Sequence, residues 1–121
     1  MVVLPCNGLS ARGQVTTLAV DQVTEGFEGL RCVNIVPLMA GVAEDVAELQ
    51  AARAVVGVAG CHHRCDAHAC RQVLHREPDD AFVVGEMLRA EVIERTEMTD
   101  EEFRQCALEV ASRLVGILGK Y

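Results

Sequence analysis

A short, wholly apolar stretch near the middle of the chain constrains its fold more than any other feature. The stretch covers residues 54–59, and residues 1–4 have the same character. A strand without polar alternation is typical of a parallel sheet that is covered on both faces. Such a sheet needs helices on each side, so we expect an α/β fold of three layers.

Helical patterns alternate with the apolar stretches along the chain. We expect strands at residues 2–4, 30–36, 54–59 and 81–84, and helices at residues 10–26, 42–52, 61–75 and 99–118. Thr99 and Glu102 form a capping box at the last helix. The order predicts one Rossmann-like domain over residues 1–121, with a four-stranded, mainly parallel sheet of strand order 2-1-3-4.

Soft metal ligands gather directly after the central apolar stretch. Residues 60–70 read GCHHRCDAHAC and hold three of the six cysteines and three of the four histidines. If this segment is helical from its start, Cys61, Cys65 and His68 share one stripe, because their spacing is i, i+4, i+7. His63 and Cys70 would then face the opposite side, which we expect to pack on the core.

Cys6 follows the first strand in the same way. Strands one and three are neighbours in the predicted sheet, and their connections leave toward opposite faces, which makes their carboxyl ends a site for ligands. We therefore expect Cys6 and Cys61 to lie close together. The helix after Ser10 would also place its positive N-terminal end near Cys6, which favours a thiolate.

These residues suit a zinc ion, which takes thiolate and imidazole ligands in tetrahedral sets. Cys6, Cys61 and Cys65 would supply three ligands, with His68 or His62 as the fourth. A site of three thiolates with an open fourth position is equally compatible. Copper(I) or an iron–sulfur cluster would also accept the thiolates, and the pattern does not separate these from zinc.

Other interpretations of the same side chains remain open. Cys61, Cys65 and Cys6 could cycle between dithiol and disulfide or carry a persulfide, although C-x3-C is not the thioredoxin-like spacing. A regulatory or partner-binding module with a structural metal is a further alternative. Cys32 and Cys106 lie within a predicted strand and an apolar helix stripe, which favours core packing. The sequence reveals neither a substrate nor a reaction, so it leaves open whether the protein is an enzyme.

Charge and hydropathy exclude several partners. The net charge is −7, which argues against nucleic acid or an anionic membrane surface as a partner. No apolar run approaches the roughly 18 residues of a membrane span, and no signal-peptide pattern opens the chain. We therefore expect a cytoplasmic protein whose cysteines are metal ligands, reactive thiols and core residues rather than disulfides.

Three blocks of the sequence resemble one protein family. The blocks are Cys6-x-Gly8-x-Ser10-x-x-Gly13-Gln14, Ala40-Gly41 and Gly60-Cys61-x-x-x-Cys65. In order and distance they are similar to the DGC domain family of zinc-binding proteins, named for a D-G-C motif. The resemblance covers roughly residues 2–85. It implies an α/β domain with cysteines gathered for a metal, and it supplies no substrate.

The chain departs from the family pattern at three places. The family's D-G-C, C-x-G-C and C-L-A-G stand here as Ala59-Gly60-Cys61, Cys6-Asn7-Gly8-Leu9 and Leu38-Met39-Ala40-Gly41. Two family thiols are therefore absent, while Cys6, Cys61 and Cys65 are retained. Either the histidines after Gly60 replace the lost ligands or the metal site is weaker, and we favour replacement.

Overall fold

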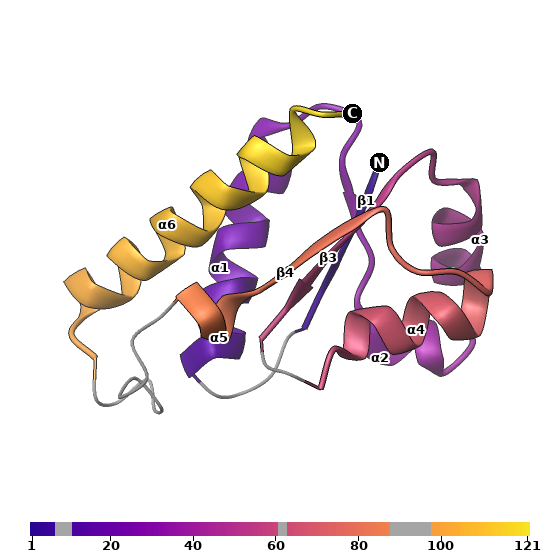
Figure 1. Cartoon of the computed structure of the whole chain (residues 1–121), viewed down its shortest axis with the longest axis horizontal. Helices are drawn as coiled ribbons and strands as arrows, with labels where there is room; N and C mark the ends of the chain where they lie inside the picture. The colour runs from indigo at the N-terminus through magenta and orange to yellow at the C-terminus, as the bar shows by residue number, and fades with distance from the viewer. Residues whose placement is uncertain (7–10, 61–62, 88–97) are drawn as a thin grey trace.

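The structure is a computed structural model of the 121-residue chain, and it describes residues 1–6, 11–60, 63–87 and 98–121. Within these residues, four strands pair in parallel in the order β2-β1-β3-β4 (Figure 1). The strands are β1 (Val2–Pro5), β2 (Arg31–Cys32), β3 (Val55–Ala59) and β4 (Asp80–Val83). The predicted strand order and strand direction are therefore confirmed.

Helices cover both faces of this sheet, as a parallel sheet requires. They are α1 (Ala11–Gly26), α2 (Ile35–Met39), α3 (Ala43–Ala51), α4 (Cys65–Leu74), α5 (Val84–Met87) and α6 (Asp100–Leu118). Figure 1 shows α1 and α6 to the left of the strands and α2, α3 and α4 to the right. In the described ranges, no helix has both the length and the apolar character needed to cross a bilayer.

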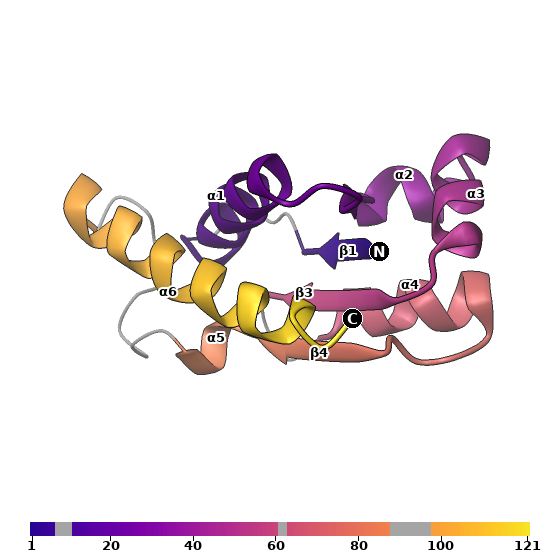
Figure 2. The ribbon, with the colours of Figure 1, turned by 90° about the horizontal axis from the view of Figure 1, so that it is seen from above.

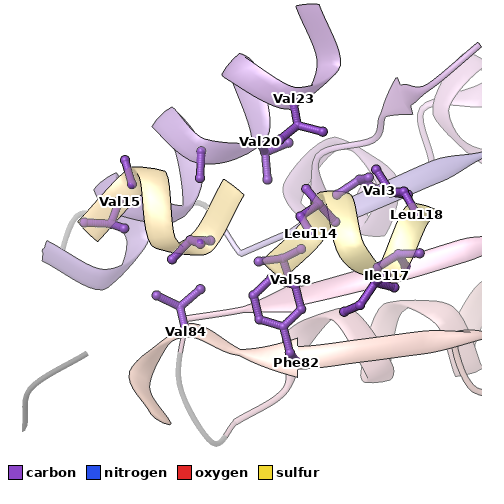
Figure 3. Packing of buried hydrophobic residues seen from close by; sticks show 14 of the residues in the cluster. Val3, Val15, Val20, Val23, Val58, Phe82, Val84, Leu114, Ile117 and Leu118 are labelled. Carbon is purple, nitrogen blue, oxygen red and sulfur yellow. The ribbon is translucent and has the colours of Figure 1, made fainter. Parts of the chain in front are cut away.

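Each face of the sheet has its own buried cluster. The cluster under α1 and α6, which we call the α1–α6 core, includes Val3, Val15, Val58, Phe82 and Leu114 (Figure 3). The cluster on the other face, which we call the α4 core, includes Leu4, Leu38, Leu49, Val55 and Cys70. Neighbouring residues of one strand enter different cores because side chains alternate along a strand. This explains why β1 and β3 are apolar throughout.

Contacts between α1 and α6 complete the α1–α6 core. The two helices pack against each other, and Figure 2 shows them from above, beside the strands. The predicted capping box begins α6: the Glu102 N–H donates to the Thr99 hydroxyl, and the Thr99 N–H donates to the Glu102 carboxylate. The predicted end of α1 at Gly26 is also confirmed.

The second strand is shorter than the sequence predicts. An apolar strand was expected over residues 30–36, but β2 ends at Cys32, and α2 begins at Ile35. Pro37 lies in the first turn of α2, where its missing N–H has no intrahelical partner to lose. A short apolar run ahead of a proline therefore served as the start of a helix and not as a strand.

The third helix begins one residue later than expected. The sequence predicts a helix from residue 42, but Val42 is the N-cap of α3 and is 42% exposed, so its side chain does not pack in the core. Leu49 of the same helix is fully buried in the α4 core.

Candidate metal centre

The carboxyl ends of β1 and β3 lie side by side and bring Cys6 close to Gly60, the first residue of the segment 60–70 that is rich in cysteine and histidine. Pro5 pairs with Val58, and the Cys6 N–H donates to the Val58 carbonyl at 2.9 Å. A Cβ atom placed on Gly60 would lie 3.9 Å from the Cys6 Sγ. The thiol of Cys6 therefore lies beside Gly60, the residue directly before the predicted ligand Cys61.

Arg12, in the first turn of α1, brings a positive charge to the same edge. A Cβ on Gly85 would lie 3.4 Å from both Cδ and Nε of Arg12 and 3.0 Å from the Gly60 carbonyl oxygen. The Cδ and Nε atoms of Arg12 therefore lie across the carboxyl ends of β3 and β4. Its Nε is buried and has no acceptor in the described part of the chain.

Arg12 was not predicted from the sequence as part of the site. The signal that could have identified it is its place in the first turn of a helix that directly follows a thiol-bearing strand. Side chains in that turn lie beside the carboxyl end of the strand, at the edge where ligands bind in parallel sheets.

Helix α4 begins later than the sequence predicts. A helix was expected from Cys61 onward, but α4 begins at Cys65. Arg64 precedes it in the left-handed conformation, with φ 50° and ψ 54°, which a right-handed helix cannot include. Of the predicted stripe, Cys65 and His68 therefore belong to α4, and Cys61 lies outside the described residues.

A buried ion pair fixes this late start. Asp66 is fully buried, and its two carboxylate oxygens accept hydrogen bonds from Nε and Nη2 of Arg64 at 3.0 and 3.1 Å. The Arg64 side chain is 35% exposed, and the hydrogen bond to Asp66 raises the pKa of its guanidinium. The carboxylate lies over Gly57 of β3, where a Cβ would come within 1.9 Å of Asp66 Oδ2.

The predicted ligands differ in their surroundings. Cys6 is partly buried, while Cys65 and His68 are exposed on α4. Cys61 and His62 lie outside the described residues. Over the described ranges, no three Cys, His, Asp or Glu side chains are grouped so that they could share a metal ion. A centre of three or more protein ligands at this edge therefore depends on residues such as Cys61 and His62.

Other cysteines pack in the interior. Cys70 is fully buried in the α4 core, as predicted, whereas His63, expected on the same side, is exposed. Burial raises the pKa of Cys70, and burial together with the charge of Asp21 raises the pKa of Cys32 to about 11. Both thiols therefore stay protonated at neutral pH and are poor ligands. Cys106 is partly buried against the α1–α6 core.

One of the two missing family thiols is replaced by a leucine that packs in the core. Leu38, which stands where the family pattern has a cysteine, is 1% exposed and lies in the α4 core. Gly41, which the family pattern shares, has φ 80° and turns the chain between α2 and α3. The fold therefore uses this segment for packing and turning. Leu9, at the other substituted position, lies outside the described residues.

The described fold and edge define a parallel α/β domain with a thiol at its topological switch point. The family model for the DGC domain matches residues 2–110. The chain therefore belongs to the DGC domain family. No curated protein and no solved structure matches it.

Proposed function

We propose that this is a small cytoplasmic protein that binds zinc, or another metal that prefers thiolates, at the carboxyl edge of its sheet. Cys6, Cys61 and Cys65 are the proposed ligands, with His68 or His62 as the fourth. The observation that carries this proposal is the position of the Cys6 Sγ, 3.9 Å from a Cβ placed on Gly60, because Cys61 follows Gly60 directly. Membership of the DGC domain family supports the same chemistry.

The charge of Arg12 suits such a centre. Three thiolates around one divalent cation leave a net negative charge, and the buried Nε of Arg12 has no acceptor in the described ranges. A guanidinium beside anionic sulfur forms charge-assisted hydrogen bonds, which are stronger than neutral ones. Arg12 would therefore offset the charge of the ligand set, and zinc bound there would act as a structural ion or, with an open position, as a Lewis acid.

Metal analysis of untagged protein tests the proposal. We expect about one zinc ion per chain, lost in a Cys61→Ser/Cys65→Ser variant. The matched control is Cys32→Ser/Cys106→Ser, which also removes two thiols but from the packed interior. This control should keep its metal. Equal, near-zero metal in the wild type and the Cys61→Ser/Cys65→Ser variant would remove the proposal.

A thiol-redox function is the second candidate, favoured by the same short approach of Cys6 to Gly60. Under a mild oxidant such as diamide, Cys6 and Cys61, or Cys61 and Cys65, would lose two protons and two electrons and form a disulfide. Mass spectrometry with and without reductant would detect the bond. Only slowly alkylated, reduced thiols after oxidant treatment would count against this function.

A structural role for the metal is distinguished by chelation. If the metal holds the fold together, removing it with a chelator unfolds the chain, as in other small metal domains. If the centre is an open site on a domain with its own cores, the circular dichroism spectrum survives chelation. The two clusters of buried side chains in the described part of the chain favour the second outcome.

A further inference from the structure

We infer that Asp66 is a positioning residue of the metal centre. Its carboxylate, which is hydrogen-bonded to Arg64 and packs over Gly57, determines the position of Cys65. The inference rests on the proposed metal binding at this edge. It assigns a role to a charged pair whose members flank one proposed ligand on both sides.

Strand β3 provides the space that the Asp66 carboxylate occupies. Gly57 lies in the middle of the sheet, paired with Leu4 of β1 and Ala81 of β4. A Cβ at this position would stand 1.9 Å from Oδ2, 2.8 Å from Cγ and 3.1 Å from Cβ of Asp66. Only glycine leaves room for the carboxylate against the strand. The contact therefore fixes the first turn of α4 at one point along β3.

The pair also fixes the direction in which the chain enters α4. Asp66 is fully buried, and a buried carboxylate must be paired to be tolerated. Its partner is not on a distant element but two residues away, and the two hydrogen bonds of 3.0 and 3.1 Å accompany a left-handed Arg64 backbone. That conformation is costly for a residue with a side chain. The hydrogen bonds to a fixed carboxylate offset this cost.

This arrangement constrains the backbone on both sides of the proposed ligand Cys65. Strand β3 ends at Ala59, and α4 begins at Cys65. The Gly57–Asp66 contact holds the start of α4 against β3, and the Arg64–Asp66 pair sets the backbone just before Cys65. Partners that orient metal ligands in this way raise metal affinity even though they do not touch the metal.

Asp66→Asn tests the inference, because it keeps the size of the side chain and removes its charge. Zinc affinity is measured by competition with a chelator, and the cobalt(II) spectrum reports the thiolate geometry. We expect Asp66→Asn to weaken zinc binding about 10- to 100-fold and to alter the cobalt spectrum. Leu114→Ala is the control: it lowers the melting temperature from the α1–α6 core and should leave both readouts within about twofold of the wild type.

Two further variants keep the test decisive if Asp66→Asn does not fold. Arg64→Lys retains the charge but loses the forked pair, and we expect a smaller loss of zinc affinity in the same direction. Gly57→Ala should displace the carboxylate and weaken zinc binding. In an Asp66→Ala background, Gly57→Ala should weaken zinc binding less, because the carboxylate 1.9 Å from the added Cβ is gone. The remaining Cβ–Cβ separation of 3.1 Å is still tight and requires a shift of a few tenths of an ångström.

The outcomes separate the two proposals. If the wild type binds no metal, both the metal function and the positioning role fall. If the wild type binds zinc, but Asp66→Asn and Arg64→Lys match Leu114→Ala in affinity and spectrum, only the positioning role is overturned. A selective loss in the Asp66 and Arg64 variants supports it.

Discussion

The two faces of the sheet are built differently. The α1–α6 core is filled by apolar side chains. Thr16 of α1 is also buried, and its hydroxyl donates to the Arg12 carbonyl one turn earlier in the same helix. The α4 face instead buries the charged Asp66 against β3. Apolar packing is tolerant and adds stability, whereas a buried ion pair adds directional constraint. We therefore expect truncations in the α1–α6 core to act mainly on stability, and changes at the Arg64–Asp66 pair to act mainly on the geometry of the proposed ligand Cys65.

The largest expected effect comes from truncating the α1–α6 core. Leu114 of α6 is fully buried (Figure 3), so Leu114→Ala should lower the free energy of unfolding by about 2–5 kcal/mol. Urea denaturation followed by circular dichroism measures this loss. Leu108 on the same helix is 53% exposed, and Leu108→Ala should stay within about 0.5 kcal/mol of the wild type. A large loss of zinc affinity in Leu114→Ala would contradict the expectation that the α1–α6 core affects stability but not zinc binding.

The next largest expected effect is a loss of stability at alkaline pH, caused by deprotonation of Cys32, which packs against the α1–α6 core. Burial and Asp21 raise the pKa of this thiol from 9.0 to about 11. The unfolded chain loses this proton first, so the stabilising contribution is complete below pH 9.0 and disappears as the pH rises to about 11. The contribution stays well below about 3 kcal/mol, because Cys32 is partly exposed and solvent screens its charge.

Cys32→Ser isolates that contribution, because serine does not titrate in this range. On going from pH 8 to about pH 11, the free energy of unfolding should decrease less in the variant than in the wild type. An identical decline in both proteins would show that the Cys32 environment does not favour the neutral thiol.

Removing the cap of α6 should have a moderate effect. Thr99→Ala deletes the hydroxyl that accepts the Glu102 N–H at 3.1 Å, which should cost about 1 kcal/mol. Thr99→Ser keeps the hydroxyl and serves as the control. Thermal unfolding of the two variants measures the difference, and the zinc affinity of both should match the wild type if the faces act separately.

The smallest effect is expected where the chain end meets the sheet. Lys120 donates to Asp80 at 3.0 Å and lowers the pKa of that carboxyl. The pair lies at the surface, so Lys120→Ala should cost less than about 1 kcal/mol at neutral pH. The wild type should lose this advantage as the pH falls below 3.8, the ordinary pKa of the carboxyl. A difference that grows on acidification would contradict this assignment.

Much of the sheet could be predicted because its signals are local. The apolar stretches at residues 2–4 and 54–59 carry enough pattern to give two central strands, and the capping box gives the start of α6. The short β2 could not be predicted, since the apolar run before Pro37 suits a strand and the first turn of a helix equally well.

The candidate site was less predictable because its geometry depends on tertiary contacts. The approach of Cys6 to Gly60 follows from strand order, which the helix and strand pattern already indicated. The start of α4 at Cys65 depends on a carboxylate packed over Gly57, a contact between segments whose pattern gives no sign of it. The buried Nε of Arg12 likewise becomes visible only once α1 lies beside the ends of β3 and β4.

The most direct test of the central claim uses cobalt(II) in a Cys6→Ser variant. Thiolate-to-cobalt charge-transfer absorption reports the number of sulfur ligands, so replacing one of three proposed thiolates should reduce the band by about a third and weaken binding. Cys32→Ser should leave the spectrum unchanged. A Cys6→Ser protein that binds cobalt as tightly as the wild type, with the same band, would contradict a shared site at the ends of β1 and β3.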